Sequence, residues 1–398
     1  ISSGGTISYA FGDKNKASGA SISAPNASDF TWETVVTKNI GLDLGLLNNR
    51  LNMTADIYVR DTKDMLMASK DLPNVYGASS PKTNAANLRT KGWEASISWN
   101  DSFNLKGKAF HYSVVLGLAD NTTKVTKYNN DNKTLGTPYE GQQLGEIWGY
   151  VVDGLFKTDE EAENYPVNQS YVNNILNISV KSQGLHAGDV KYVDLDGDNI
   201  ISPTLSANDV KDQKVIGNSL PRYTYSVRLA ADWNGIDFSA LLQGVGRQHW
   251  YPNGETSLFW GPYARPYCTF IPKDFLTDVW SEDNPDAYFP RPRGYVALDV
   301  NPRELSKPNT RYLQNVAYCR LKNVTVGYSL PRTWLKALHM ERVRVYFSGE
   351  NLFTFSPLHS NYIAPDHAGA STSWKSGHTN VTSYPMSKTY SFGIDVTF

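Results

Sequence analysis

Apolar and polar residues alternate with a period of two along much of the chain. In the last segment, the apolar positions are Tyr390, Phe392, Ile394, Val396 and Phe398. Successive side chains of a β-strand point to opposite faces, so this alternation predicts a strand with one apolar and one polar face. The same pattern recurs at 32–46, 51–59, 93–99, 110–118, 223–233, 324–328 and 343–347, and more weakly around 7–11. We therefore expect about ten strands and an antiparallel all-β fold.

The predicted strands are long, and the connections between them alternate in length. Many strands exceed the ~5–6 residues usual in globular sheets and reach the ~9–11 residues with which a tilted strand crosses a bilayer. Short turns are predicted at 48–49, 101–106, 234–235 and 331–341, and long polar connections at 69–82, 126–220, 250–310 and 357–385. Outer-membrane barrels have short periplasmic turns and long external loops. The pattern favours such a barrel, with 126–220 and 250–310 as long extracellular loops.

Composition excludes several classes of protein. The 38 Lys and Arg residues balance 39 Asp and Glu residues, which gives a net charge of −1 and argues against a nucleic-acid partner. Tyr residues (24) outnumber Phe residues (15), a bias that suits a surface between apolar and aqueous surroundings. No segment approaches the ~20 apolar residues of a membrane-spanning helix. Because the chain begins at Ile1, we expect either a removed signal peptide or a start partway through a longer protein.

A series of short stretches, in this order, carries a resemblance to a known family. They are 145–150 (GEIWGY), 153–156 (DGLF), 158–162 (TDEEA), 188–192 (GDVKY), 194–198 (DLDGD), 215–218 (VIGN), 221–223 (PRY), 320–324 (RLKNV), 327–328 (GY) and 348–355 (SGENLFTF). Through them, the chain resembles the C-terminal part of a SusC-like TonB-dependent transporter of the Bacteroidetes outer membrane.

This resemblance implies that residues 1–398 form the C-terminal ~10 strands of a plugged transmembrane barrel of about 22 strands. The plug, the segment that contacts TonB and the N-terminal strands would lie outside this chain. The family's function implies import of large nutrients, either glycan oligosaccharides or peptides, across the bacterial outer membrane. The implied partners are a SusD-like lipoprotein, TonB, the transported glycan or peptide, and outer-membrane lipid.

An acidic stretch in the longest predicted loop has the spacing of a calcium loop. Asp194, Asp196 and Asp198 take its first, third and fifth positions, and the backbone carbonyl of Ile200 takes its seventh. Two departures from the pattern are Asn199 at the sixth position and Leu205 at the twelfth. The terminal carboxylate would therefore come from Asp209 or from Asp212. We predict bound Ca²⁺ (or Mg²⁺) within 194–209, against the alternative of a solvated acidic loop held by Asx turns.

A second set of candidate residues lies in the predicted loop at 250–310. Its aromatic members are Trp250, Tyr251, Trp260, Tyr263 and Tyr267. Exposed aromatic side chains on a loop can stack on sugar faces or pack against a partner protein. They can also form a small core within the loop itself. We predict substrate or partner contact and keep the core interpretation open.

Catalytic motifs do not emerge. The seven histidines are scattered, and the sequence contains no HExxH, G-x-S-x-G or P-loop pattern. We therefore expect a protein that is not an enzyme. The alternative function is that of a soluble or surface-attached β protein that binds carbohydrate through its aromatic loops.

Overall fold

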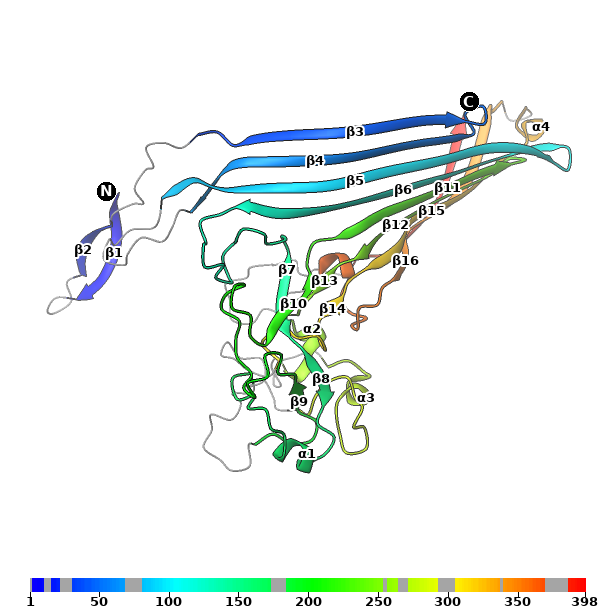
Figure 1. Ribbon diagram of the computed structural model, residues 1–398. Coiled ribbons are helices and arrows are strands. Elements are labelled where there is room, and N and C mark those ends of the chain that lie inside the picture. Colours follow the sequence, from blue (N-terminus) through cyan, green and yellow to red (C-terminus); the bar gives the residue numbers. More distant parts are fainter. Residues whose placement is uncertain are drawn as a thin grey trace.

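The computed structural model describes residues 2–10, 16–21, 31–68, 81–172, 184–252, 256–263, 271–292, 305–336, 339–368 and 386–398. Nine strands form one antiparallel sheet in the order β17-β16-β15-β12-β11-β6-β5-β4-β3 (Figure 1). Their bounds are β3 (Thr34–Leu46), β4 (Leu51–Ala68), β5 (Lys82–Leu105), β6 (Lys108–Lys127), β11 (Arg222–Trp233), β12 (Ile236–Arg247), β15 (Tyr318–Ser329), β16 (Arg342–Phe355) and β17 (Thr389–Thr397). Within the described residues, no helix is both long and apolar enough to cross a bilayer.

The sheet confirms the antiparallel all-β prediction and most of the expected strands. The weak candidate around 7–11 differs: β1 (Ser2–Ala10) pairs only with β2 (Lys16–Ser21) in a separate two-stranded sheet, and residue 11 lies outside the described residues. Strands β4, β5 and β6 are longer than the alternating segments, with 18, 24 and 20 residues. They continue because backbone pairing does not require apolar side chains beyond the segment that the alternation marks.

Short turns join the strands at one end of the sheet, and long connections leave from the other (Figure 1). The predicted Asn234-Gly235 hairpin is confirmed, with φ of 50° and 85° as a two-residue turn with positive φ requires. The turn expected at 101–106 lies later, because β5 continues to Leu105. Lys106 and Gly107 form that turn with φ of 52° and 78°, the positive values that close the hairpin.

The long connections contain their own secondary structure. Their elements are β7 (Glu146–Tyr150), β8 (Val152–Leu155), α1 (Asp159–Glu163), β9 (Val190–Tyr192), β10 (Gln213–Asn218), β13 (His249–Trp250), α2 (Ser257–Trp260), η4 (Gly261–Tyr263), α3 (Phe275–Asp278), β14 (Gln314–Asn315) and η7 (Pro365–His367). The short helix α4 (Arg332–Leu335) lies in the turn between β15 and β16. The described residues of the segments 128–221 and 248–317 pack into one unit beside the long-connection end of the sheet, here called the loop subdomain.

Glycines in the strands make room for tyrosine rings on the neighbouring strand. Gly92 is the direct cross-strand partner of Tyr58, and a Cβ atom there would lie 2.4 Å from the ring. Gly393 and Tyr346 repeat this arrangement in β17 and β16, at 2.3 Å. A tyrosine ring that covers a cross-strand glycine restores packing that the missing side chain loses. These pairs help to fix the strand register.

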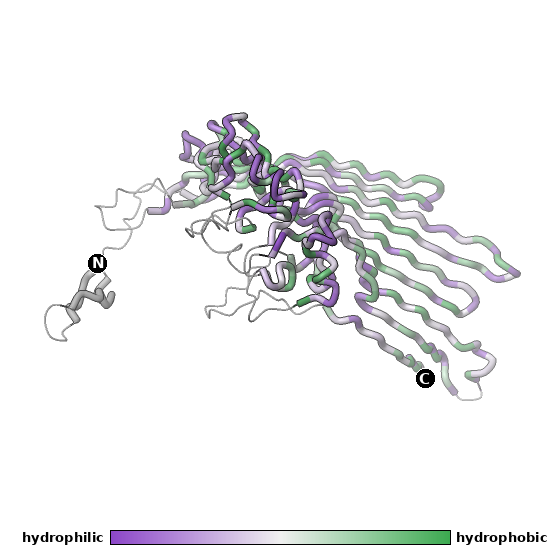
Figure 2. The backbone as a smooth tube through the Cα atoms, turned by 90° about the horizontal axis from the view of Figure 1, so that it is seen from below, coloured by the Kyte–Doolittle hydropathy of each residue, from purple (hydrophilic) through white to green (hydrophobic). Residues whose placement is uncertain are grey.

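Hydropathy alternates along the strands of the nine-stranded sheet (Figure 2). Because successive side chains of a strand point to opposite faces, the two faces of the sheet differ in polarity. One face carries large apolar side chains that remain exposed on the sheet, here called the apolar belt: Ile40, Leu42, Leu44, Ile57, Ile97, Leu116, Phe238, Val326, Val345, Phe392 and Ile394. Phe392, for example, is 83% exposed. Monomeric soluble proteins rarely expose apolar patches larger than a few hundred Å². The other face carries the polar members of each strand.

Candidate functional site

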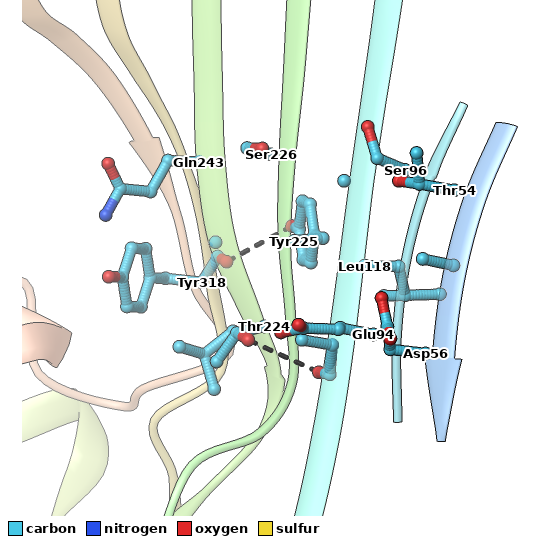
Figure 3. A pocket seen from close by; sticks show the side chains of 15 residues that line it. Thr54, Asp56, Glu94, Ser96, Leu118, Thr224, Tyr225, Ser226, Gln243 and Tyr318 are labelled. Carbon is cyan, nitrogen blue, oxygen red and sulfur yellow. Dashed lines mark hydrogen bonds between the residues drawn. The ribbon is translucent and has the colours of Figure 1, made fainter. Parts of the chain in front are cut away.

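The polar face of the sheet holds a hollow of about 550 Å³ (Figure 3). Its polar lining comes from β4, β5, β11 and β12, with β6 between β5 and β11: Thr54, Asp56, Glu94, Ser96, Thr224, Ser226 and Gln243. The strand register pairs Asp56 directly with Glu94, which places two carboxylates side by side. Within the described residues, neither carboxylate forms an ion pair, so this part of the hollow is acidic. The polar lining of the hollow can contact hydrated solutes or polar protein segments.

Near the short-turn end, one arginine joins three strands on the polar face. Arg344 of β16 contacts Asp237 of β12 at 2.6 Å and Asp395 of β17 at 3.3 Å. β15 lies between β16 and β12, and Arg344 crosses it at Gly327. A Cβ atom at Gly327 would lie 2.6 Å from the guanidinium of Arg344, so only glycine leaves room for the crossing side chain. These ion pairs stabilise the polar face of the sheet, and Arg344 is therefore a structural residue.

The loop subdomain has a core that includes several of the predicted aromatic residues. Trp260 and Tyr263 are 0% and 1% exposed, and Tyr251 is partly buried against the same core. Their polar tips are satisfied within the chain: Trp260 Nε1 donates to Pro252 at 3.1 Å, and Tyr251 donates to Leu305 at 2.9 Å.

The prediction of substrate or partner contact is therefore corrected for Trp260 and Tyr263. Their rings are enclosed by other residues of the loop, which is the core interpretation left open above. Trp250 is half-buried and packs edge-on against Phe259 at 6.5 Å. Tyr267 lies outside the described residues.

Two contacts that the sequence did not reveal tie the segment after β16 to its neighbours. His359 Nε2 lies 3.1 Å from Asp278, and the imidazole stacks on Tyr288 at 3.7 Å between ring centroids. Burial raises the pKa of Tyr288 to about 12. Arg320, which is 4% exposed, contacts both carboxylate oxygens of Asp366 at 2.7 and 2.9 Å. No local pattern predicts these contacts, because the partners lie in distant segments of the sequence.

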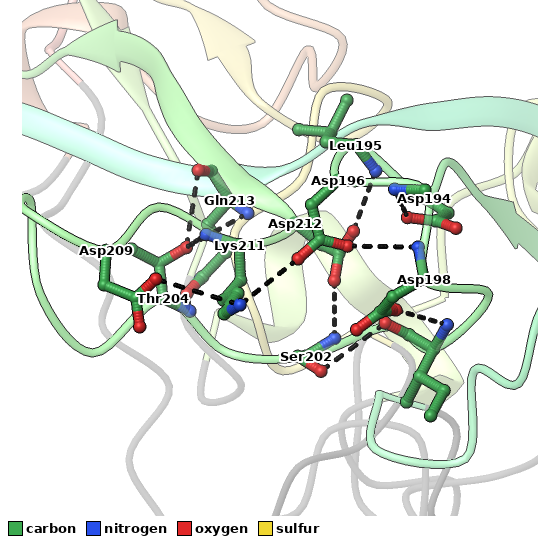
Figure 4. Close-up of polar contacts among 12 residues, drawn as sticks. Asp194, Leu195, Asp196, Asp198, Ser202, Thr204, Asp209, Lys211, Asp212 and Gln213 are labelled. Atoms are coloured by element: carbon green, nitrogen blue, oxygen red, sulfur yellow. Dashed lines mark hydrogen bonds and ion pairs between the residues drawn. The ribbon is translucent and has the colours of Figure 1, made fainter.

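The acidic stretch forms a tight loop held by its own carboxylates (Figure 4). Asp194 accepts the backbone N–H groups of Gly197 and Asn199, both at 2.7 Å. Asp198 accepts the N–H of Ile200 at 2.8 Å. Asn199 has φ of 62°, a conformation that Asn tolerates better than most residues. These are the Asx turns of the alternative interpretation.

Asp212 joins this loop as its buried carboxylate. It accepts the N–H groups of Ser202 at 2.7 Å and of Leu195 at 2.8 Å. One ligand oxygen each from Asp194, Asp196 and Asp212 lie within 4.8 Å of one another. Of the residues predicted to bind a cation, Asp194 and Asp196 therefore lie together.

The other predicted ligands point elsewhere. The side chain of Asp209 is 76% exposed and lies 3.8 Å from Lys211. Of the two candidates for the terminal carboxylate, Asp212 and not Asp209 therefore joins Asp194 and Asp196. Lys211 also lies 3.5 Å from Asp196 and partly balances its charge. The side chain of Asp198 is outside the three-carboxylate group, and the carbonyl of Ile200 accepts the hydroxyl of Ser202 at 3.4 Å.

The electrostatics of the three-carboxylate group differ between its members. Burial raises the pKa of Asp212 despite the backbone donors of Ser202 and Leu195. Burial also opposes ionisation of Asp194, but the N–H groups of Asn199 and Gly197 outweigh it and lower the pKa of Asp194. The carboxylate of Asp194 is thus stabilised in its ionised form, whereas burial destabilises the ionised form of Asp212. A cation among them would favour the ionised form of Asp212.

Comparisons with known proteins agree with this architecture. The TonB-dependent receptor P3 of Formosa agariphila is 27% identical over 389 residues, which covers 92% of this chain and 34% of that protein. SusC of Bacteroides thetaiotaomicron is 22% identical over 392 residues, covering 98% of this chain and 34% of SusC. The chain thus spans about a third of the length of the curated relatives it matches.

Solved structures support the fold. A structure of the RagAB peptide importer in the open-open state matches with a TM-score of 0.64 and 23% identity, over 97% of this chain and 37% of that chain. A structure titled as the RagAB peptide transporter matches with a TM-score of 0.65 and 21% identity, over 98% and 38%. The family profile described as "TonB dependent receptor-like, beta-barrel" matches residues 3–352. The sheet is therefore part of a TonB-dependent receptor β-barrel, and the chain belongs to that family.

Proposed function

We propose that this chain forms the C-terminal part of an outer-membrane importer that takes up large nutrients, glycan oligosaccharides or peptides, with energy delivered by TonB. The proposal extends the family assignment to the activity of the whole protein. The names of the relatives support it: SusC is a TonB-dependent receptor, and the RagAB structures are titled as those of a peptide importer.

One observation carries the proposal. The sheet exposes a continuous apolar face, whereas its opposite face is polar and hollowed. In a membrane barrel, the apolar face lies against lipid and the polar face lines an enclosed lumen. A soluble carbohydrate-binding protein would need to bury the apolar belt, and the enclosed rings of Trp260 and Tyr263 offer it no stacking surface.

We further propose that the loop subdomain lies outside the cell and contacts a SusD-like lipoprotein that covers the barrel. The described parts of the connections at 126–220 and 250–310 leave from one end of the strands, as the external loops of such barrels do. The subdomain has a packed core and is therefore a preformed surface for a partner protein. We also propose that the group of Asp194, Asp196 and Asp212 binds Ca²⁺ (or Mg²⁺), which would stiffen this surface.

The importer function is tested in the native host. Cells that lack the gene for the full-length protein are compared with complemented cells for uptake of labelled peptides and labelled oligosaccharides. We expect complemented cells to take up one of these classes only when TonB is present, and deletion cells to lose that uptake. TonB-independent uptake, or equal uptake of both classes without the gene, would contradict the proposal. Recovery of the protein without detergent would support the soluble alternative.

A further inference from the structure

A row of basic side chains directly follows the apolar belt on the outer face of β3–β6. The strand register places the belt residues Ile40 and Ile57 side by side, with the half-buried Trp93 next to Ile57 in the same row. Two positions further toward the long connections, the corresponding row consists of Lys38, Val59 and Lys91. Because side chains alternate between faces, this row points to the same side as the belt.

The next rows continue the basic character. Arg89 and Lys124 are direct cross-strand partners one row beyond Lys91, and Lys63 lies beyond them in β4. All of these side chains are exposed. We call this group the basic rim: Lys38, Lys63, Arg89, Lys91 and Lys124.

The acidic side chains on this part of the outer face are already paired. Asp61 contacts Arg89 through two bonds at 2.6 and 3.2 Å. Asp120, which is 7% exposed, is held by both nitrogens of the Arg222 fork. Within the described residues, Lys38, Lys63, Lys91 and Lys124 form no ion pair. The rim therefore presents about four positive charges that the sheet does not neutralise.

The height of the belt places the rim at the lipid headgroups. Phe103 and Trp93 mark the lower and upper aromatic ends of the outer face of β5, about ten positions apart. At ~3.4 Å per residue and a tilt of ~40°, they span about 26 Å along the barrel axis. The apolar band of outer-membrane barrels is ~25 Å tall. Lys91, two positions beyond Trp93, therefore leaves the hydrocarbon at its outer boundary.

We propose that the basic rim binds the phosphate groups of a glycolipid headgroup in the outer leaflet. Lys38 and Lys91 flank Val59 on adjacent strands, so their Cα atoms lie about 10 Å apart. Two flexible ammonium side chains at this spacing can both reach one phosphate group. Trp93 and Ile57 below them offer apolar contact to the acyl chains of the same lipid. This inference rests on the membrane orientation proposed above.

The test uses the natural full-length protein, purified in detergent and titrated with monophosphoryl lipid A, with its dephosphorylated form and with inorganic phosphate, under native mass spectrometry. The variant Lys38→Gln/Lys91→Gln removes two charges from the rim. The control Lys106→Gln/Lys108→Gln removes two exposed lysines at the short-turn end. We expect the rim variant to lose roughly thirtyfold in affinity for the phosphorylated lipid, the equivalent of about 2 kcal/mol at ~1 kcal/mol per lysine. The control variant keeps its affinity.

The inference would be overturned if the protein bound the dephosphorylated lipid as tightly as the phosphorylated one. It would also be overturned if the rim variant and the control variant lost the same affinity for the phosphorylated lipid. Complete displacement of the lipid by millimolar inorganic phosphate would overturn the assignment to a lipid. Fractionation of the cells separates this result from the proposed function: an unsubstituted protein absent from the outer membrane contradicts both. A protein that is present there and imports normally, yet binds lipid independently of Lys38 and Lys91, contradicts the basic rim alone.

Discussion

At the scale of single residues, burial decides which side chains can meet a ligand. Trp250 and Trp260 belong to the same predicted connection at 250–310, yet Trp260 is fully buried whereas Trp250 is only half-buried. Likewise, Asp209 and Asp212 are three positions apart, but only Asp212 turns into the acidic loop, where two backbone N–H groups hold it. Such differences depend on how the chain packs around a position rather than on the residue type.

The acidic loop gives a prediction at this scale. Addition of Ca²⁺ should raise the unfolding temperature of the loop subdomain, by the equivalent of about 2.7 kcal/mol at a concentration ~100-fold above Kd. Asp212→Asn should abolish this effect, whereas Asp209→Asn should keep it, because Asp209 lies outside the carboxylate group. Tryptophan fluorescence, to which Trp260 and Trp280 contribute from the core of the loop subdomain, reports the unfolding.

The same experiment has a defined pH dependence. The pKa of Asp212 is raised, so without a cation its ionisation costs stability as the pH rises through that pKa. With Ca²⁺ the sign reverses, because the ion binds the carboxylate. The Ca²⁺ effect should therefore decrease as the pH falls through the raised pKa of Asp212. A Ca²⁺ effect that is equal in Asp212→Asn and the unsubstituted protein would contradict the site.

At the scale of elements, the hairpins show how local sequence and packing combine. Asn234-Gly235 was predictable, because that dipeptide favours positive φ at both positions. For the next hairpin, the sequence predicts a turn at 101–106, which is earlier than the observed turn at Lys106 and Gly107. Polar residues near the end of β5 hide the position at which this strand ends. Backbone pairing between β5 and β6 continues to Leu105 and Lys108, which fixes the turn.

The two turns differ in their surroundings, and this gives a matched pair of variants. Both glycines have positive φ, at 85° for Gly235 and 78° for Gly107. A Cβ atom at Gly235 would lie 2.7 Å from the backbone oxygen of Ser329, whereas at Gly107 nothing lies within 4 Å. Gly107→Ala should cost about 1–2 kcal/mol through strain alone. Gly235→Ala should cost more.

The measurement is the urea midpoint of the folded, fast-migrating band of the barrel in lipid vesicles. Equal midpoints for the two alanine variants would show that the hairpin relaxes away from Ser329. That outcome would contradict a rigid register between β12 and β15 at this turn.

At the scale of the whole molecule, the opposed faces of the sheet define what surrounds it. Ile97 and Ser96 are neighbours in β5, but Ile97 belongs to the apolar belt and Ser96 lines the hollow. Ile97→Arg would place a charge near the middle of the lipid-facing band, at a cost of about 2–4 kcal/mol. Ser96→Arg would face the aqueous interior.

We therefore expect Ile97→Arg to lower the folded fraction and the outer-membrane abundance of the protein, and Ser96→Arg to change both little. Quantitative blotting of outer-membrane fractions, with and without heating, measures both quantities. If the serine variant were the more damaging, the assignment of the two faces would be reversed.

The sequence by itself determined the strands, their antiparallel order, the alternation of short and long connections, and the family. These features follow from local geometry, because a period of two is a property of the extended backbone and is visible in adjacent residues. Only the tertiary structure decided that Trp260 is core, that Asp212 joins Asp194, and that Arg320 holds Asp366. Each of these contacts depends on the path of a long connection, and residue patterns do not encode that path locally.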